Sequence, residues 1–321
     1  MTNTVNGAGA PTTAAAPVAT QRGRLVLGAL LGAAAMTLVG GSIAASRVLA
    51  DAPSLTAQAV RYALATALLA GYAKLRRVPL RRPRGWQWAW LLAVSGCGLV
   101  VFNLALMAGS RHAEPAVFGV AMAAVPVLLA LLGPVLEHRA PTVRAVLGAL
   151  VVTAGAALVE GFGRTDAVGL LLAVTVFVCE AAFTLCAVPV LAQHGAVGVS
   201  WHACWIATVA FGVGGVWREG PTAVLRFTSG EWAAVIYMAV GVTAVAFVCW
   251  YTGVRLLGSD RAGLLTGVAP VAAIGAGMLL GDAAPAPAVW LGIAVVAMGL
   301  TIGLRAGRRR AGRVPVAPAV E

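Results

Sequence analysis

Charged residues are scarce in this chain, and their scarcity excludes an ordinary water-soluble domain. Asp, Glu, Lys and Arg make up 11 % of the 321 residues, whereas a soluble globular domain carries about 25 %. Apolar residues account for 60 %, and the mean hydropathy is +0.90. Long apolar stretches separated by short polar segments therefore predict an all-α integral membrane protein.

Sequence motifs for chemistry are also missing. The five cysteines are odd in number, lie in apolar stretches and form no CxxC pair, which argues against a disulfide framework and a zinc site. No HExxH, GxSxG or Walker A pattern occurs, so an intramembrane hydrolase or lipid transferase is disfavoured. We expect no catalytic residues, no metal, no cofactor and no enzyme activity. The net charge of +12 resides mainly in short loops and the tail, so we expect no nucleic-acid partner.

Glycines and prolines recur at a constant separation of 144 residues, without a gap. The coinciding residues are Gly109 and Gly253, Gly119 and Gly263, Pro126 and Pro270, Gly133 and Gly277, Gly148 and Gly292, and Gly155 and Gly299. Because these residue types mark positions with special backbone needs, the register predicts one fold built twice. Repeats of about half the chain are typical of membrane transporters, whereas solenoid units are far shorter.

Ten apolar segments are each long enough to cross the hydrocarbon core of a bilayer, which takes about 20 residues. They are 25–46, 54–73, 86–108, 115–136, 141–160, 167–192, 198–217, 231–254, 260–281 and 285–304. We expect two repeats of five helices, at 25–161 and 162–305. A disordered segment, 1–24, precedes them, and a basic tail, 306–321, follows.

The lysines and arginines fall unevenly on the two sides of this topology. Most of the 23 lie on the side that would hold both termini, so the positive-inside rule places both termini in the cytoplasm. Five helices is an odd number, which means that equivalent helices of the two halves cross the membrane in opposite directions. We therefore predict that the chain is an inverted-repeat protein located in the cytoplasmic membrane, with a substrate route between its two halves.

The sequence resembles the drug/metabolite transporter superfamily, and specifically its EamA-type members with five plus five helices. The resemblance rests on Gly40-Gly41-Ser42, Arg61-Tyr62, Ala124 to Val127, Glu137, Val268 to Val271 and Leu280-Gly281-Asp282. Gly40 stands where the family usually has an aromatic residue, and Asp282 where it usually has Glu. The resemblance implies a secondary carrier without a nucleotide-binding domain, usually an exporter of small metabolites or drugs. In the family the last helix of each half often mediates dimerisation, which leaves a homodimer open.

Glu180 is the outstanding ionisable residue, because it stands in the middle of the segment 167–192. A carboxylate at this depth costs about 2.5–3.5 kcal/mol on insertion scales, so it is expected to face the bundle interior. There it serves either as a proton or substrate site or as a structural carboxylate. Arg61, in the second segment, either pairs with Glu180, binds an anionic substrate or snorkels to the headgroups.

Further candidates are polar, aromatic or conformational. Asn103, Thr243 and Trp250 lie within spans; the first two either line the cavity or join helices, and Trp250 faces the cavity or lipid. Pro126 and Pro270 are mid-helix prolines that kink both halves and free the carbonyls near Met122 and Thr266. We expect the carboxylates at span ends, Glu137, Asp282, Glu114 and Asp260, to act mostly as caps or loop residues.

The function predicted from these residues is secondary active transport. We expect export of a small organic metabolite or drug by proton antiport and alternating access, with the substrate and membrane lipid as partners. An importer remains an alternative, because no residue fixes the direction of transport. A lipid-linked flippase of the same superfamily is a second alternative.

Overall fold

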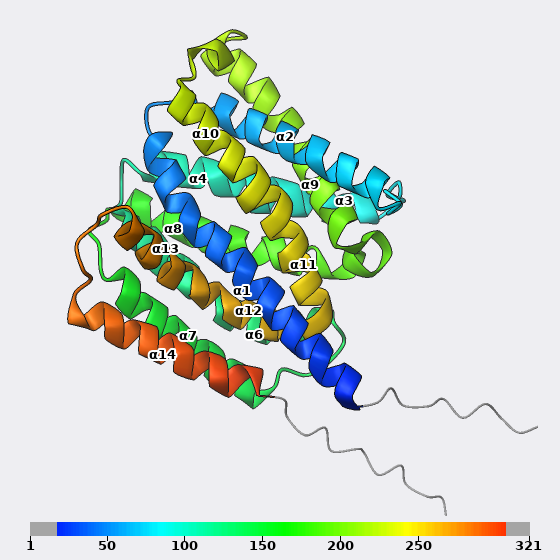
Figure 1. Ribbon diagram of the computed structural model, residues 1–321, viewed down its shortest axis with the longest axis vertical. Coiled ribbons are helices and arrows are strands. Elements are labelled where there is room, and N and C mark those ends of the chain that lie inside the picture. The colour runs from blue at the N-terminus through cyan, green and yellow to red at the C-terminus, as the bar shows by residue number, and fades with distance from the viewer. Residues whose placement is uncertain (1–17, 306–321) are drawn as a thin grey trace, which may run out of the picture.

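The structure, a computed structural model, describes residues 18–305 and is helical almost throughout (Figure 1). Within this range no strand forms; a single backbone bridge joins Ala113 to Thr165. The expected basic tail 306–321, and residues 1–17 of the expected N-terminal segment, lie outside the described part. The predicted all-helical fold is confirmed.

Each half of the chain contributes five spans, and several spans are built from more than one helical piece. The first half contains α1 (Val18–Val48), α2 (Ser54–Leu75), the composite of α3 (Gln87–Ser95), η1 (Gly96–Val101) and α4 (Phe102–Gly109), then α5 (Pro115–Ala123) with α6 (Val125–Leu136), and α7 (Val143–Glu160). The second half contains α8 (Ala167–Leu185), α9 (Val188–Glu219), the short η2 (Ala223–Arg226), the composite of α10 (Ser229–Tyr237), η3 (Met238–Val245) and α11 (Ala246–Leu257), then α12 (Ser259–Leu264), η4 (Leu265–Gly267) and α13 (Val268–Leu279), and α14 (Pro287–Leu304).

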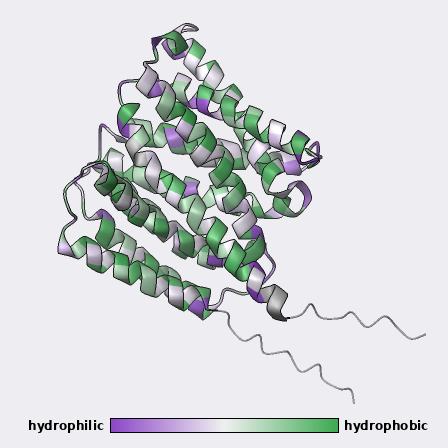
Figure 2. Ribbon diagram, viewed as in Figure 1, coloured by the Kyte–Doolittle hydropathy of each residue, from purple (hydrophilic) through white to green (hydrophobic). Residues whose placement is uncertain are grey.

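Length and composition mark this chain as a multi-pass membrane protein. Nine helical segments among the described residues are long and apolar enough to cross a bilayer. The second predicted span, α2, is 22 residues long but carries Gln58, Arg61 and Lys74, and it is not among the nine. Hydrophilic residues gather at helix ends and loops, whereas hydrophobic residues run along the helices (Figure 2).

The prediction of a single span over 167–192 is wrong at its C-terminal end. The α8 helix stops at Leu185, and α9 starts at Val188 with Pro189 in its first turn, where a residue without an N–H is tolerated. Gly195 then adopts φ 66° and ψ 173°, which breaks the helical path. Because only glycine adopts such a conformation at little cost, the sequence separates a short arm, 188–194, from the rest of α9.

The last helices of the two halves pack against each other in antiparallel fashion (Figure 1). A Cβ atom on Gly148 would lie 2.7 Å from Gly303 Cα, and one on Gly292 would lie 3.0 Å from Val159 N. In the 144-residue register Gly148 corresponds to Gly292 and Val159 to Gly303. The contact of Gly148 with Gly303 is therefore the repeat equivalent of the contact of Gly292 with Val159. Such reciprocal contacts are what an inverted repeat requires. Because these glycines bring α7 and α14 together within one chain, close packing explains them.

Two irregularities also recur in both halves. The third span of each half contains a π-helical segment, η1 in the first and η3 in the second, and the two overlap in the repeat register. The fourth span of each half is interrupted just before Val125 and just before Val268, shortly ahead of Pro126 and Pro270. Proline removes a backbone donor, and π-segments are frequent at functional sites.

The helix ends define two faces of the molecule. The terminal face holds the start of α1 and the end of α14, together with the connections 76–86, 137–142 and 258 (Figure 1). The opposite face holds the connections 49–53, 110–114, 161–166, 220–228 and 280–286.

Candidate central binding cavity

A cavity of about 580 Å³ lies between the two halves. Its lining reaches Ser46, Ala50 and Ser110, which are exposed at the opposite face, and includes no residue of the connections at the terminal face. Among the described residues, the lining of the cavity therefore reaches the opposite face and not the terminal face. Its volume falls within the range of about 300–1,000 Å³ that is usual for small-molecule sites.

Arg61 lines this cavity from α2 and is held by uncharged partners. Its Nε donates to Thr243 Oγ1 at 2.7 Å, and its Nη1 donates to Gln58 Oε1 at 3.4 Å. The guanidinium also lies 5.1 Å from the ring centroid of Tyr62. Thr243 is fully buried in η3 and does not line the cavity. It joins helices and positions Arg61, which is the second of the two roles considered for it.

Asn103 connects the same cluster to the third span. Its Nδ2 donates to Leu99 O at 2.7 Å and to the Tyr62 hydroxyl at 3.1 Å, and its Oδ1 accepts from Gln58 Nε2 at 3.0 Å. Leu99 lies in the π-segment η1. Asn103 both lines the cavity and links two helices, so the two roles considered for it coexist.

Glu180 projects into the cavity from α8 and is half-buried. No hydrogen bond or ion pair joins its carboxylate to any residue in the described range, Arg61 included. The pairing with Arg61 that the sequence suggested is therefore absent from this structure. The carboxylate is open to a proton or to a cationic group of a ligand, whose contact would offset the cost of placing it at this depth.

Glu160 is a second cavity carboxylate, and sequence reasoning missed it. It is the last residue of α7, and its carboxylate occupies the space that a side chain at Gly119 would fill. It is half-buried and has no hydrogen-bond partner within residues 18–305. A negative side chain is unfavourable at a helix C-terminus, and that misfit is the signal that singles it out.

The remaining candidates divide between the cavity and the packed interior. Trp250 is 3 % exposed, lines the cavity and donates from Nε1 to Thr184 Oγ1 at 2.9 Å. Pro270 also lines the cavity, whereas Pro126 is buried and does not line it. Met122 and Thr266, which stand four positions before the two prolines, both line the cavity.

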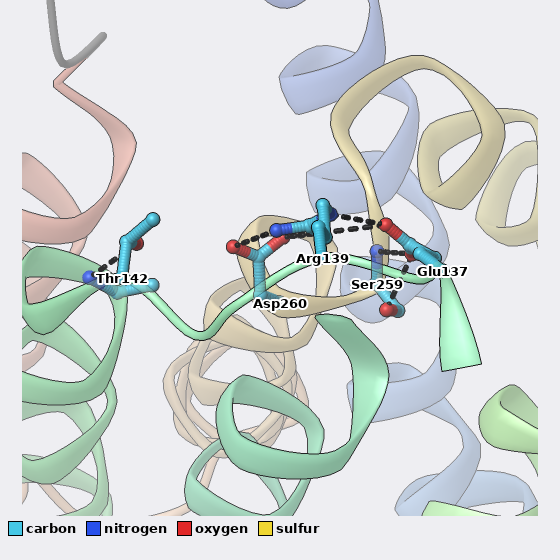
Figure 3. A network of polar contacts seen from close by, with 6 residues as sticks. Glu137, Arg139, Thr142, Ser259 and Asp260 are labelled. Carbon is cyan, nitrogen blue, oxygen red and sulfur yellow. Dashed lines mark hydrogen bonds and ion pairs between the residues drawn. The ribbon is translucent and has the colours of Figure 1, made fainter. Parts of the chain in front are cut away.

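A network of charged and polar side chains joins the two halves at the terminal face (Figure 3). Arg139 donates to both oxygens of Asp260, at 3.1 and 2.6 Å, and to Glu137 Oε2 at 2.7 Å. Glu137 Oε1 accepts from the backbone N of Ser259 at 2.8 Å and from its hydroxyl at 2.6 Å. At the other end of the same loop Thr142 caps α7 by accepting from Ala145 N.

Burial makes this network stronger than a surface ion pair. Asp260 is only 2 % exposed, against 35 % for the Arg139 side chain. Burial alone would lower the pKa of Arg139, but the hydrogen bonds and charges of Asp260 and Glu137 raise it above its usual value. Glu137 and Asp260 therefore do more than cap helices, because together they hold the halves closed on this side of the cavity.

At the opposite face Glu219 joins the halves by accepting from Leu55 N and from Thr56 N and Oγ1 at 2.7–2.9 Å, whereas two ion pairs on that face are more exposed. Arg47 lies 3.3 Å from Asp282, and both side chains are largely exposed. Glu114 precedes α5 without capping it through its side chain, and pairs instead with Arg164 at 2.8 Å. That hydrogen bond lowers the pKa of Glu114 below its usual range. Exposed pairs of this kind add little to stability, because water screens their charges.

The fold and cavity define the class as a polytopic membrane transporter with an internal repeat. Two stretches of the chain, 26–161 and 167–304, match the family described as the EamA-like transporter family. The chain belongs to this family, and the resemblance drawn from its motifs is confirmed.

Similar proteins give the same assignment without adding a substrate. The chain is 24 % identical over 258 residues to the "Uncharacterized transporter YetK" of Bacillus subtilis (strain 168), covering 75 % of this chain and 76 % of that one. A solved structure named simply "Crystal structure of protein" matches with a TM-score of 0.72 and 22 % identity, over 86 % of this chain and 96 % of its own. At that identity the likeness concerns the fold alone.

Proposed function

We propose that this protein is a proton-coupled exporter that moves a small organic cation across the cytoplasmic membrane by alternating access. The observation that carries the proposal is a cavity closed at the terminal face and lined by two carboxylates that have no hydrogen-bond or ion-pair partner among residues 18–305. Membership of a transporter family supports the transport activity. The proton coupling and the positive charge of the substrate are inferred from the residues of the cavity.

The charges of the cavity favour a cationic substrate. Arg61 is engaged by Thr243 and Gln58 and sits beside the face of Tyr62. Glu160 and Glu180 have no such contacts, so the cavity offers more unsatisfied negative than positive charge. Its walls are otherwise largely apolar and aromatic, which suits an amphipathic amine.

Proton coupling follows from competition for the same carboxylate. In the proposed cycle, Glu180 binds the substrate cation when it is ionised and releases it when a proton arrives from the opposite face. Glu160 lies at the end of α7 near that face, so it offers the entering proton a first acceptor. One carboxylate thus cannot hold proton and cation together, which is the physical basis of exchange.

Transport by the purified full-length protein in proteoliposomes tests this proposal. A panel of organic amines and neutral or anionic metabolites is assayed with and without a pH gradient. We expect pH-driven flux of a cation in the wild type and in Glu114→Gln, a loop carboxylate outside the cavity, but not in Glu180→Gln. Unchanged pH-driven flux in a well-folded Glu180→Gln protein would rule out the proposed role, and flux of anions alone would rule out the substrate class.

A further inference from the structure

A second pocket, separate from the central cavity, lies at the terminal face between the connection 76–86 and the arm at the start of α9. It has a volume of about 400 Å³ and is lined by Arg81, Arg82, Arg84, Gln87, Gln193 and His194. Nothing in the transport cycle proposed above uses these residues.

The walls of this pocket are fixed by a hydrogen-bond network centred on Gln87. Its Oε1 accepts from Arg84 N at 3.0 Å and faces His194 Nε2 at 3.1 Å, and its Nε2 donates to Gln193. A carbonyl oxygen only accepts, so His194 carries its proton on Nε2. Gln87 therefore ties the arginine-rich loop to the arm of α9.

The other end of the loop is anchored through its backbone. Trp205 Nε1 donates to His202 Nδ1 at 3.0 Å, which leaves His202 Nε2 to donate to the carbonyl of Arg81, also at 3.0 Å. Both His202 and His194 are almost fully buried, at 3 % and 4 % exposed. The three arginines thus project from a backbone that is held in place before any ligand binds.

The pocket carries positive charge without a counterion. Arg81, Arg82 and Arg84 are exposed, and no carboxylate in the described range lies within ion-pair distance of them. The buried Nδ1 of His194 has no hydrogen-bond partner. Guanidinium groups bind phosphate oxygens through paired hydrogen bonds, so three of them around one hollow match a phosphate better than a carboxylate.

The surroundings of the pocket are those of a membrane surface. Leu75 and Trp86 flank the arginine loop and are 81 % and 53 % exposed. Tryptophan at the end of a span is typical of the headgroup region, and basic pockets between membrane helices bind lipid phosphates. We propose that this pocket binds a phosphate ester at the terminal face, carried by an anionic phospholipid or by a soluble phosphorylated compound.

Binding to the purified full-length protein in neutral detergent tests this site. The ligands are short-chain phosphatidylglycerol, short-chain phosphatidylcholine and glycerol 3-phosphate. The pocket variant combines Arg81→Gln, Arg82→Gln and Arg84→Gln. A matched control combines Lys74→Gln, Arg76→Gln and Arg77→Gln, which removes the same charge from the end of α2 and the start of the same connection, outside the pocket.

We expect phosphatidylglycerol to bind more tightly than phosphatidylcholine. The pocket variant should weaken its binding by at least about tenfold, because each charged hydrogen bond lost accounts for roughly a factor of ten. The control should change binding less than about twofold. Binding of glycerol 3-phosphate with the same dependence on the three arginines identifies the soluble source, and its failure to bind identifies the lipid.

Two results would overturn the site. Equal binding of the anionic and zwitterionic lipids would mean that the pocket does not select ligands by their negative charge. Equal losses of affinity in the pocket and control variants would mean that binding depends on the total charge of this region and not on the pocket. Thermal unfolding verifies that each variant is folded. The single variants Arg82→Gln and Arg84→Gln give the same comparison in smaller steps if the triple variant aggregates.

Discussion

Removing the charge of Asp260 should open the transporter toward its terminal face. Asp260 accepts two hydrogen bonds from Arg139, which belongs to the other half of the chain. Asp260→Asn keeps the shape and one acceptor oxygen but loses the charge and one of these bonds. A hydrogen bond to a charged group contributes about 1.5–3 kcal/mol, and the 35 % exposure of Arg139 argues for the lower end of that range.

The expected loss of about 1.5–2 kcal/mol changes an equilibrium constant by roughly ten- to thirtyfold. The equilibrium in question lies between the conformation described here and a conformation that is open at the terminal face. Leu129 is fully buried, and a Cβ on Gly263 of the other half would lie 2.8 Å from it. A cysteine at Leu129, in a background without the five native cysteines, is therefore a reporter of this opening.

Labelling of that cysteine by a membrane-impermeant thiol reagent measures the shift. The reagent is applied from the terminal face to vesicles of known orientation, and the Asp260→Asn protein should react about tenfold faster than its parent. Asp282→Asn is the matched control, because its partner Arg47 is exposed and joins the halves at the opposite face. An unchanged rate in Asp260→Asn, or an equal rise in Asp282→Asn, would refute the reasoning.

Four further substitutions test the packing of the site, the packing of the repeat and the role of Glu160. Thr243→Val should lower the thermal stability in detergent by about 1.5–3 kcal/mol, because Arg61 Nε loses its acceptor; unaltered stability would contradict this. Gly299→Ala should destabilise the protein, because the new Cβ would lie 2.7 Å from Val152 N, whereas Gly212→Ala, with open space around it, should stabilise it by about 0.5–1 kcal/mol. Glu160→Gln should slow pH-driven flux while substrate exchange at constant pH continues, and loss of both would assign Glu160 to substrate binding.

The repeated architecture could be predicted because glycine and proline report backbone needs directly. Gly148 and Gly292 coincide in the sequence register, and both lie where α7 and α14 are too close for a Cβ atom. The breaks before Pro126 and Pro270 follow from the missing N–H of proline in the same way. Helix ends were harder to predict, since α8 ends at Leu185 although the sequence stays apolar as far as Ala192.

The candidate site was only partly accessible from the sequence. An ionisable residue in the middle of an apolar stretch, such as Arg61 or Glu180, stands out because burial of a charge is costly. Glu160 lies at the C-terminal end of α7, where its charge opposes the helix dipole, but only the tertiary fold brings it to the cavity. The pairing of Arg139 with Asp260 joins residues 121 positions apart, and no local pattern encodes such a contact.

The two halves share a fold but not the network that closes one side of it, and this difference has an energetic consequence. In the repeat register Glu137 and Arg139 correspond to Gly281 and Ala283, and Ser259 and Asp260 correspond to Pro115 and Ala116. None of these four counterparts carries a charged side chain, so the opposite face has no equivalent network at these positions. Within the proposed cycle this network therefore contributes to only one of the two conformations, the one that is closed at the terminal face. The direction of the shift in Asp260→Asn follows from this, since that substitution weakens bonds which only one of the two conformations possesses.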